Sequence, residues 1–111
     1  MIEQRDLLLV PFPFSDQSGR KVRPVIVIGN NEFNQDSEDV IVIGVTSNIL
    51  KDKYTINLNN EDLDEGKLIT TCCIKIENIL KLDKEIIIKK IGKINMTTLK
   101  KVINGLLTII S

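Results

Sequence analysis

The hydrophobic residues of this chain fall mostly into short runs separated by polar turns, a pattern typical of short β-strands. The run Val40–Val45 is almost wholly β-branched and uninterrupted by charge, so we expect a strand buried on both faces. Tyr54–Leu58 alternates apolar and polar residues and predicts a half-buried strand. The full set of expected strands is 7–10, 23–28, 40–45, 54–58, 68–76 and 86–91.

The segments between these runs are polar and rich in turn-forming residues. Pro11 and Pro13, two positions apart, should end the first strand. The loop 15–22, the connection 30–38 and the acidic stretch 59–66 are expected to be irregular, with at most one helical turn at 77–80.

Near the C-terminus the spacing of the hydrophobic residues changes from that of a strand to that of a helix. Asn95 or Thr97 could cap a helix there, and Gly105 inside it would cost about 1 kcal/mol relative to alanine. Its apolar residues recur on one helical face: Leu99, Val102, Ile103, Leu106, Leu107 and Ile110. We therefore predict a mainly β (α+β) fold, a small, strongly bent antiparallel sheet or barrel with a C-terminal helix, in one domain spanning 1–111. The apolar helix face also makes a homodimer plausible.

Charge and composition narrow the chemistry. The 111 residues include 15 basic and 15 acidic side chains, so any affinity for nucleic acid must come from a local patch. The chain has no histidine, which excludes a histidine-dependent triad or a paired-histidine ribonuclease and removes the commonest metal ligand.

The two cysteines, Cys72 and Cys73, are adjacent. Neighbours on a strand point to opposite faces, so a disulfide between them would be strained, and we expect one to face the core and the other not. No leader or membrane-length apolar run is visible, which predicts a soluble, cytoplasmic protein with reduced thiols.

Arg23, directly before Pro24, is the leading candidate for chemistry. Proline holds the preceding residue in an extended conformation, so Arg23 should be a fixed cation at the start of a strand. Thr46 ends another strand, and antiparallel pairing would bring the two side chains to one edge. A guanidinium and a hydroxyl can together stabilise charge on a phosphoryl group without histidine. Further hydroxyl candidates are Ser15, Ser18 and Ser47.

Each of these residues also has a simpler interpretation. An arginine that opens a strand commonly points into water, and polar residues commonly end strands. Arg20 and Lys21 would either add phosphate contacts or form a solvated turn. Asp16 and Glu77 would be acids or bases, or ordinary surface charges.

Taken in order, several segments resemble the MazF/PemK-type toxins of type II toxin–antitoxin systems. The matching segments are Leu9–Phe14, the polar loop 15–21, Arg23–Ile28, Ile43–Ser47, Glu77–Ile79 with Asp83-Lys84, Ile91–Ile94 and the amphipathic tail. The resemblance spans almost the whole chain, and the order and spacing of the segments are more specific than any one of them.

The resemblance implies an SH3-like barrel, a homodimer and an endoribonuclease that cleaves single-stranded mRNA at specific sequences without a metal or cofactor. In such a reaction the ribose 2′-hydroxyl attacks the adjacent phosphate and leaves a 2′,3′-cyclic phosphate and a 5′-hydroxyl. It also implies a cognate antitoxin, a small and partly disordered acidic protein that covers the RNA groove.

Residue by residue, the family's catalytic arginine matches Arg23 and its catalytic threonine matches Thr46. Arg23 would stabilise the phosphorane and, less readily, transfer a proton, while Thr46 would hold a non-bridging oxygen. The expected RNA-binding residues are Ser15, Asp16, Gln17, Ser18, Arg20, Lys21, Ser47, Glu77, Asn78 and Lys81.

Two alternatives remain open from sequence. One is a non-enzymatic, gyrase-binding toxin like CcdB, although those proteins resemble a pattern with a tryptophan near the C-terminus and this chain has none. The other is a catalytically silent domain that binds RNA or a protein partner, which the neutral net charge permits.

Overall fold

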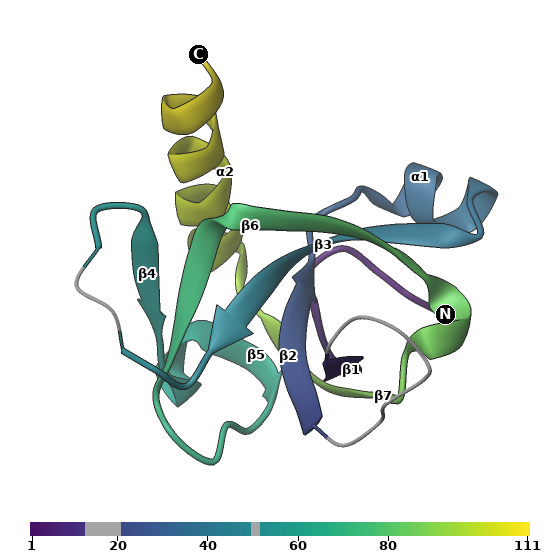
Figure 1. The fold of residues 1–111 in the computed structure, drawn as a ribbon, viewed down its shortest axis with the longest axis horizontal. Coiled ribbons are helices and arrows are strands. Elements are labelled where there is room, and N and C mark those ends of the chain that lie inside the picture. The colour runs from purple at the N-terminus through teal and green to yellow at the C-terminus, as the bar shows by residue number, and fades with distance from the viewer. Residues whose placement is uncertain (13–20, 50–51) are drawn as a thin grey trace.

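The computed structural model of the protein describes residues 1–12, 21–49 and 52–111, and its core is one curled antiparallel sheet (Figure 1). The strands lie in the order β4-β6-β3-β2-β1-β7-β5, and every neighbouring pair is antiparallel. Their bounds are β1 Asp6–Phe12, β2 Lys21–Val27, β3 Asp39–Thr46, β4 Thr55–Leu58, β5 Leu63–Gly66, β6 Cys72–Asp83 and β7 Lys89–Ile94. The prediction of a mainly β, strongly bent sheet is confirmed, and the sheet curls into a half-barrel.

Helix α2, Met96–Ile110, closes the chain as predicted, and Asn95 caps it by accepting a 2.8 Å hydrogen bond from the backbone N–H of Thr98. Gly105 lies where the helix meets β6: a methyl group there would collide with the side chain of Ile76. The glycine therefore lets the helix approach the sheet closely, which offsets its low helix propensity.

Several expected boundaries were wrong. The polar connection 30–38 contains a short helix, α1 (Asn31–Asp36), because Asn30 caps it. The acidic stretch 59–66 forms a 3-10 turn and then β5, which pairs with β7. Residues 77–80 form no helical turn, because β6 runs from Cys72 through them and pairs with β3. The last strand begins at Lys89 rather than Ile86, since 84–86 form a 3-10 turn.

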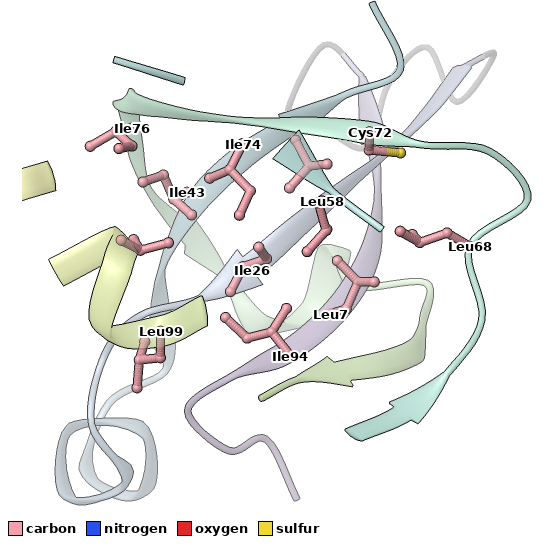
Figure 2. Packing of buried hydrophobic residues seen from close by; sticks show 12 residues of the cluster. Leu7, Ile26, Ile43, Leu58, Leu68, Cys72, Ile74, Ile76, Ile94 and Leu99 are labelled. Atoms are coloured by element: carbon pink, nitrogen blue, oxygen red, sulfur yellow. The ribbon is translucent and has the colours of Figure 1, made fainter. Parts of the chain in front are cut away.

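The central strands are buried on both faces, as expected for 40–45. One cluster lies between the curled sheet and α2 and includes Leu7, Ile26, Ile43 and Leu99 (Figure 2). The opposite cluster takes the alternate positions of the same strands: Leu8, Val10, Val25, Val27, Val40, Val42 and Leu82. The face of this second cluster continues to the strand ends where the candidate residues Arg23 and Thr46 lie.

Cys72 and Cys73 are both buried and both free, so the expectation that only one faces the core was wrong. The two side chains point to opposite faces of β6: Cys72 belongs to the first hydrophobic cluster, and Cys73, opposite Thr46 on β3, is fully buried on the other face. Burial, with the neighbouring Cys73 as a smaller cause, raises the pKa of the Cys72 thiol. None of the described helices is long and apolar enough to span a membrane.

Candidate functional site

Arg23 and Thr46 lie at the same end of two hydrogen-bonded strands. β2 and β3 pair antiparallel, and Val25 lies opposite Gly44. Arg23 is two residues before Val25 and Thr46 is two residues after Gly44, so both belong to the face that carries Val25 and Val42. The antiparallel pairing that the sequence suggested is present, and it brings the two residues to the same end of β2 and β3.

Two adjoining hollows open at this end of β2 and β3, and we call the two together the cleft. The smaller, about 280 Å³, and the larger, about 430 Å³, share Arg23 and Thr46 among their lining residues. Both hollows are open to solvent and lined largely by polar groups. Such a surface suits an extended, charged ligand better than a small apolar ligand, which binds in an enclosed pocket.

The guanidinium of Arg23 lies over the ring of Phe12, with 4.3 Å between Cζ and the ring centroid. Among the residues that the structure describes, no carboxylate forms an ion pair with Arg23. Among these residues, the contact that fixes the guanidinium is a neutral aromatic ring, which does not cancel its positive charge.

Thr46 is 9% exposed and is fixed by the turn that follows it. Its Oγ1 accepts a 3.1 Å hydrogen bond from the backbone N–H of Asn48. A hydroxyl that accepts in this way keeps its own proton for donation. The arrangement can therefore offer a directed hydrogen bond to a phosphate oxygen beside the Arg23 charge.

The opposite wall of the smaller hollow comes from β6, through Lys75 and Asn78. β6 bulges here, because Ile43 lies opposite Ile79 while Val45 lies opposite Ile74. The Asn78 amide occupies the space where a side chain at Gly44 would be, so the glycine is needed for this wall.

The predicted RNA-binding residues separate into three groups. Lys21 and Ser47 line the larger hollow and Asn78 the smaller one. Glu77 and Lys81 line neither: Lys81 lies further along β6, opposite Ile41, and its ammonium is 3.8 Å from the Asp39 carboxylate. The other predicted residues, Ser15, Asp16, Gln17, Ser18 and Arg20, lie outside the described residues.

The lining residues that sequence reasoning did not nominate include Phe12, Asn48 and Lys75. A signal for Asn48 was present, because it follows Thr46 and Ser47 directly. Phe12 and Lys75 come from other strands, and only the pairing of β1 with β2 and the bend of β6 place them beside Arg23.

A second group of charged side chains lies where β1 meets β7, and we call it the ion cluster: Glu3, Asp6, Glu65, Lys90 and Lys93. Asp6 is only 1% exposed, and its Oδ1 is 3.3 Å from Lys90 Nζ and 3.8 Å from Lys93 Nζ. Glu3 accepts a 2.7 Å hydrogen bond from Lys93, which lowers the pKa of the Glu3 carboxyl. Desolvation lowers the pKa of Lys90, but its contacts with Glu65 and Asp6 outweigh this and leave that pKa raised. Both ammonium groups of the cluster are thus paired with carboxylates.

Within the described ranges, no three histidine, cysteine, aspartate or glutamate side chains gather in a way that could hold a metal ion. The side chains that line the cleft offer a guanidinium, a hydroxyl, amides and ammonium groups.

Comparisons with known proteins show the family and agree with this fold. The family described as PemK-like, MazF-like toxin of type II toxin–antitoxin system matches residues 3–110. The endoribonuclease MazF of Staphylococcus saprophyticus is 33% identical over 98 residues, which cover 88% of this chain and 79% of that protein. The chain therefore belongs to the PemK-like, MazF-like family of toxins.

Solved structures show the same fold. An endoribonuclease in complex with its cognate antitoxin from a mycobacterial species superposes with a TM-score of 0.79 at 18% identity, covering 97% of this chain and 93% of that one. MazF in a MazE–MazF structure from Deinococcus radiodurans gives 0.77 at 14% identity, covering 99% and 95%. At these identities the likeness establishes the fold.

Proposed function

We propose that this protein is an endoribonuclease and the toxin of a type II toxin–antitoxin pair, and that it cleaves single-stranded mRNA at the cleft. The family and the name of its relative in Staphylococcus saprophyticus both support an endoribonuclease. The observation that carries the proposal is the meeting of the Arg23 guanidinium and the Thr46 hydroxyl in one open, polar cleft.

In the proposed reaction the ribose 2′-oxygen attacks the adjacent phosphorus and loses its proton. The bond from phosphorus to the 5′-oxygen breaks, and that oxygen gains a proton. The products are a 2′,3′-cyclic phosphate and a 5′-hydroxyl. Negative charge builds on the non-bridging oxygens, where Arg23 supplies a cation and Thr46 a hydrogen bond. Arginine rarely gives up its proton, so we assign Arg23 to charge stabilisation rather than to proton transfer.

The rest of the cleft would hold the strand on either side of the scissile phosphate. Lys21 and Lys75 supply positive charge at its two walls, and Ser47, Asn48 and Asn78 supply hydrogen-bonding groups. These contacts give an otherwise neutral chain a local site for RNA. Glu77 and Lys81 would contact only nucleotides outside the cleft.

The proposal includes a protein partner and a location. Toxins of this fold have been solved with their antitoxins, and we infer a cognate antitoxin for this chain. We also infer a homodimer that acts in the cytoplasm, where its mRNA substrate is translated.

Cleavage of a long single-stranded RNA by purified protein in the presence of EDTA tests the activity and its independence of metal together. We expect fragments that end in a 2′,3′-cyclic phosphate, identified by mass spectrometry, and a loss of about a thousandfold or more in rate for Arg23→Ala. Lys100→Ala removes a cation from the exposed surface of α2 and is the matched control. Intact RNA at high protein excess, or RNA binding without cleavage, would contradict the proposal.

A further inference from the structure

The side chain of Phe12, on β1, lies against the guanidinium of Arg23, on the neighbouring strand β2. In the β1–β2 ladder Val10 lies opposite Arg23 and Phe12 lies opposite Lys21. Phe12 is thus the diagonal neighbour of Arg23 on the same face of the sheet, within reach of a long side chain. The 4.3 Å between the guanidinium carbon and the ring centroid is well inside the range of a cation–π contact.

The two residues stand at the end of a buried column. Val10 and Val25 belong to the second hydrophobic cluster, and Phe12 and Arg23 lie two positions further along the same strands. The cluster fixes both backbones, while the side chains at the strand ends reach the smaller hollow. The ring is therefore held on a rigid element and presents its face to the cation.

Arg23 needs such a support because its side chain has many rotamers. A carboxylate partner would fix the guanidinium but would also cancel its charge, and among the described residues none does so. An aromatic face restrains the guanidinium plane and leaves its N–H groups and its positive charge for a phosphate.

We propose that Phe12 is a positioning residue, which holds the Arg23 guanidinium in the orientation that stabilises the phosphorane. This inference rests on the proposed ribonuclease function. If it holds, removal of the ring face lowers kcat, because the interaction it supports develops in the transition state, while KM changes little.

The test compares Phe12→Leu, which keeps an apolar side chain, with Phe12→Tyr, which keeps the aromatic face. Each is made in the wild-type chain and in Arg23→Lys, and kcat and KM are measured on one RNA that contains a mapped cleavage site. We expect about a tenfold loss of kcat for Phe12→Leu, near-wild-type kcat for Phe12→Tyr, and an effect of Phe12→Leu that shrinks in the Arg23→Lys chain.

A measurement without RNA keeps the inference falsifiable if a variant is unstable. In an NMR spectrum of the full chain, the ring current of Phe12 should shift the Arg23 Nε–H resonance upfield, and Phe12→Leu should remove that shift. A resonance at an unstacked position in the wild-type chain would overturn the inference whatever the kinetics.

The remaining outcomes separate the two proposals. If the wild type cleaves RNA and Phe12→Leu keeps its kcat within twofold, or raises only KM, the positioning role is wrong and the ribonuclease function stands. An equal loss of kcat in the wild-type and Arg23→Lys chains would show that Phe12 acts independently of Arg23 and would also overturn the inference. If the wild type does not cleave RNA, the ribonuclease proposal fails, and the catalytic role of Phe12 fails with it.

Discussion

The basic side chains of the cleft differ from those of the ion cluster in what surrounds them. In the ion cluster Lys90 and Lys93 contact the buried Asp6, and each also contacts a glutamate. In the cleft the Arg23 guanidinium lies over the ring of Phe12, and no described carboxylate pairs with it. Both groups are placed by β1 and its neighbouring strands, one by β2 and the other by β7.

This difference shows that the number of charged side chains in a group does not indicate whether the group can bind a ligand; the contacts of each charge matter more. In this chain of formal net charge zero, the described carboxylates that form ion pairs do so with Arg5, Lys81, Lys90 and Lys93, and none of them pairs with Arg23. The ion cluster is expected to contribute to stability and the cleft to activity, and the predictions below test that separation.

After that of Arg23→Ala, the largest effect on cleavage is expected at Thr46. Thr46→Val keeps the shape of the side chain but removes the hydroxyl, so we expect a loss of about a hundredfold in RNA cleavage, near the effect of deleting one donor to a developing oxyanion. Unfolding should become easier by only about 1 kcal/mol, because one hydrogen bond from Asn48 is lost. Single-turnover cleavage and urea denaturation measure the two quantities. Thr97→Val, in the exposed first turn of α2, is the control, and equal activity of the two variants would contradict the assignment.

A smaller effect, of the opposite kind, is expected in the ion cluster. Asp6→Asn leaves two ammonium groups beside a buried position without their shared anion, so the free energy of unfolding should fall by about 2–3 kcal/mol. Cleavage by the folded variant at 25 °C should stay within about twofold of wild type. Urea denaturation and the cleavage assay check both parts.

Asp64→Asn is the matched control for this variant. Its carboxylate is 53% exposed and 2.9 Å from Arg5, so we expect a loss below about 1 kcal/mol. Equal losses for Asp6→Asn and Asp64→Asn, or a large fall in cleavage for Asp6→Asn, would remove the distinction between the two regions.

The smallest effect concerns pH. Because the hydrogen bond to Lys93 lowers the pKa of Glu3 in the folded protein, its stabilisation is fully present near neutral pH. The stabilisation is lost as pH falls through that lowered pKa in the acid range. The melting temperature of the Glu3→Gln variant should therefore fall less steeply between about pH 5 and pH 3 than that of the wild type. Glu38→Gln, at an exposed glutamate without an ion pair among the described residues, should leave the slope unchanged.

The hydrophobic pattern predicted the strands and the helix whose buried residues are evident from their own segment of sequence. The β-branched run 40–45, the amphipathic tail and the strand after Pro24 were all found near their expected places. The segments predicted wrongly are those whose structure depends on a distant partner. Residues 63–66 become β5 only because β7 lies beside them, and 77–80 remain extended only because β3 pairs with them.

The same limit applies to the cleft. Arg23 and Thr46 could be nominated together because each marks the end of an apolar run, and antiparallel pairing of such runs is common. Lys75 and Phe12 carry no local mark of function, since an aromatic after a proline and a lysine in a strand are ordinary. Asn78 reaches the cleft because Gly44 leaves room for its amide, a contact between residues more than thirty positions apart.

The sequence by itself determined the class of fold and the absence of histidine, and it nominated Arg23 and Thr46 as candidates, because hydrophobic period, proline and residue type act locally. Among the described residues, the tertiary structure decided which charged side chains form ion pairs and which do not. Net interaction between charges depends on distance and burial, and both follow from how the strands pair and where the sheet bends.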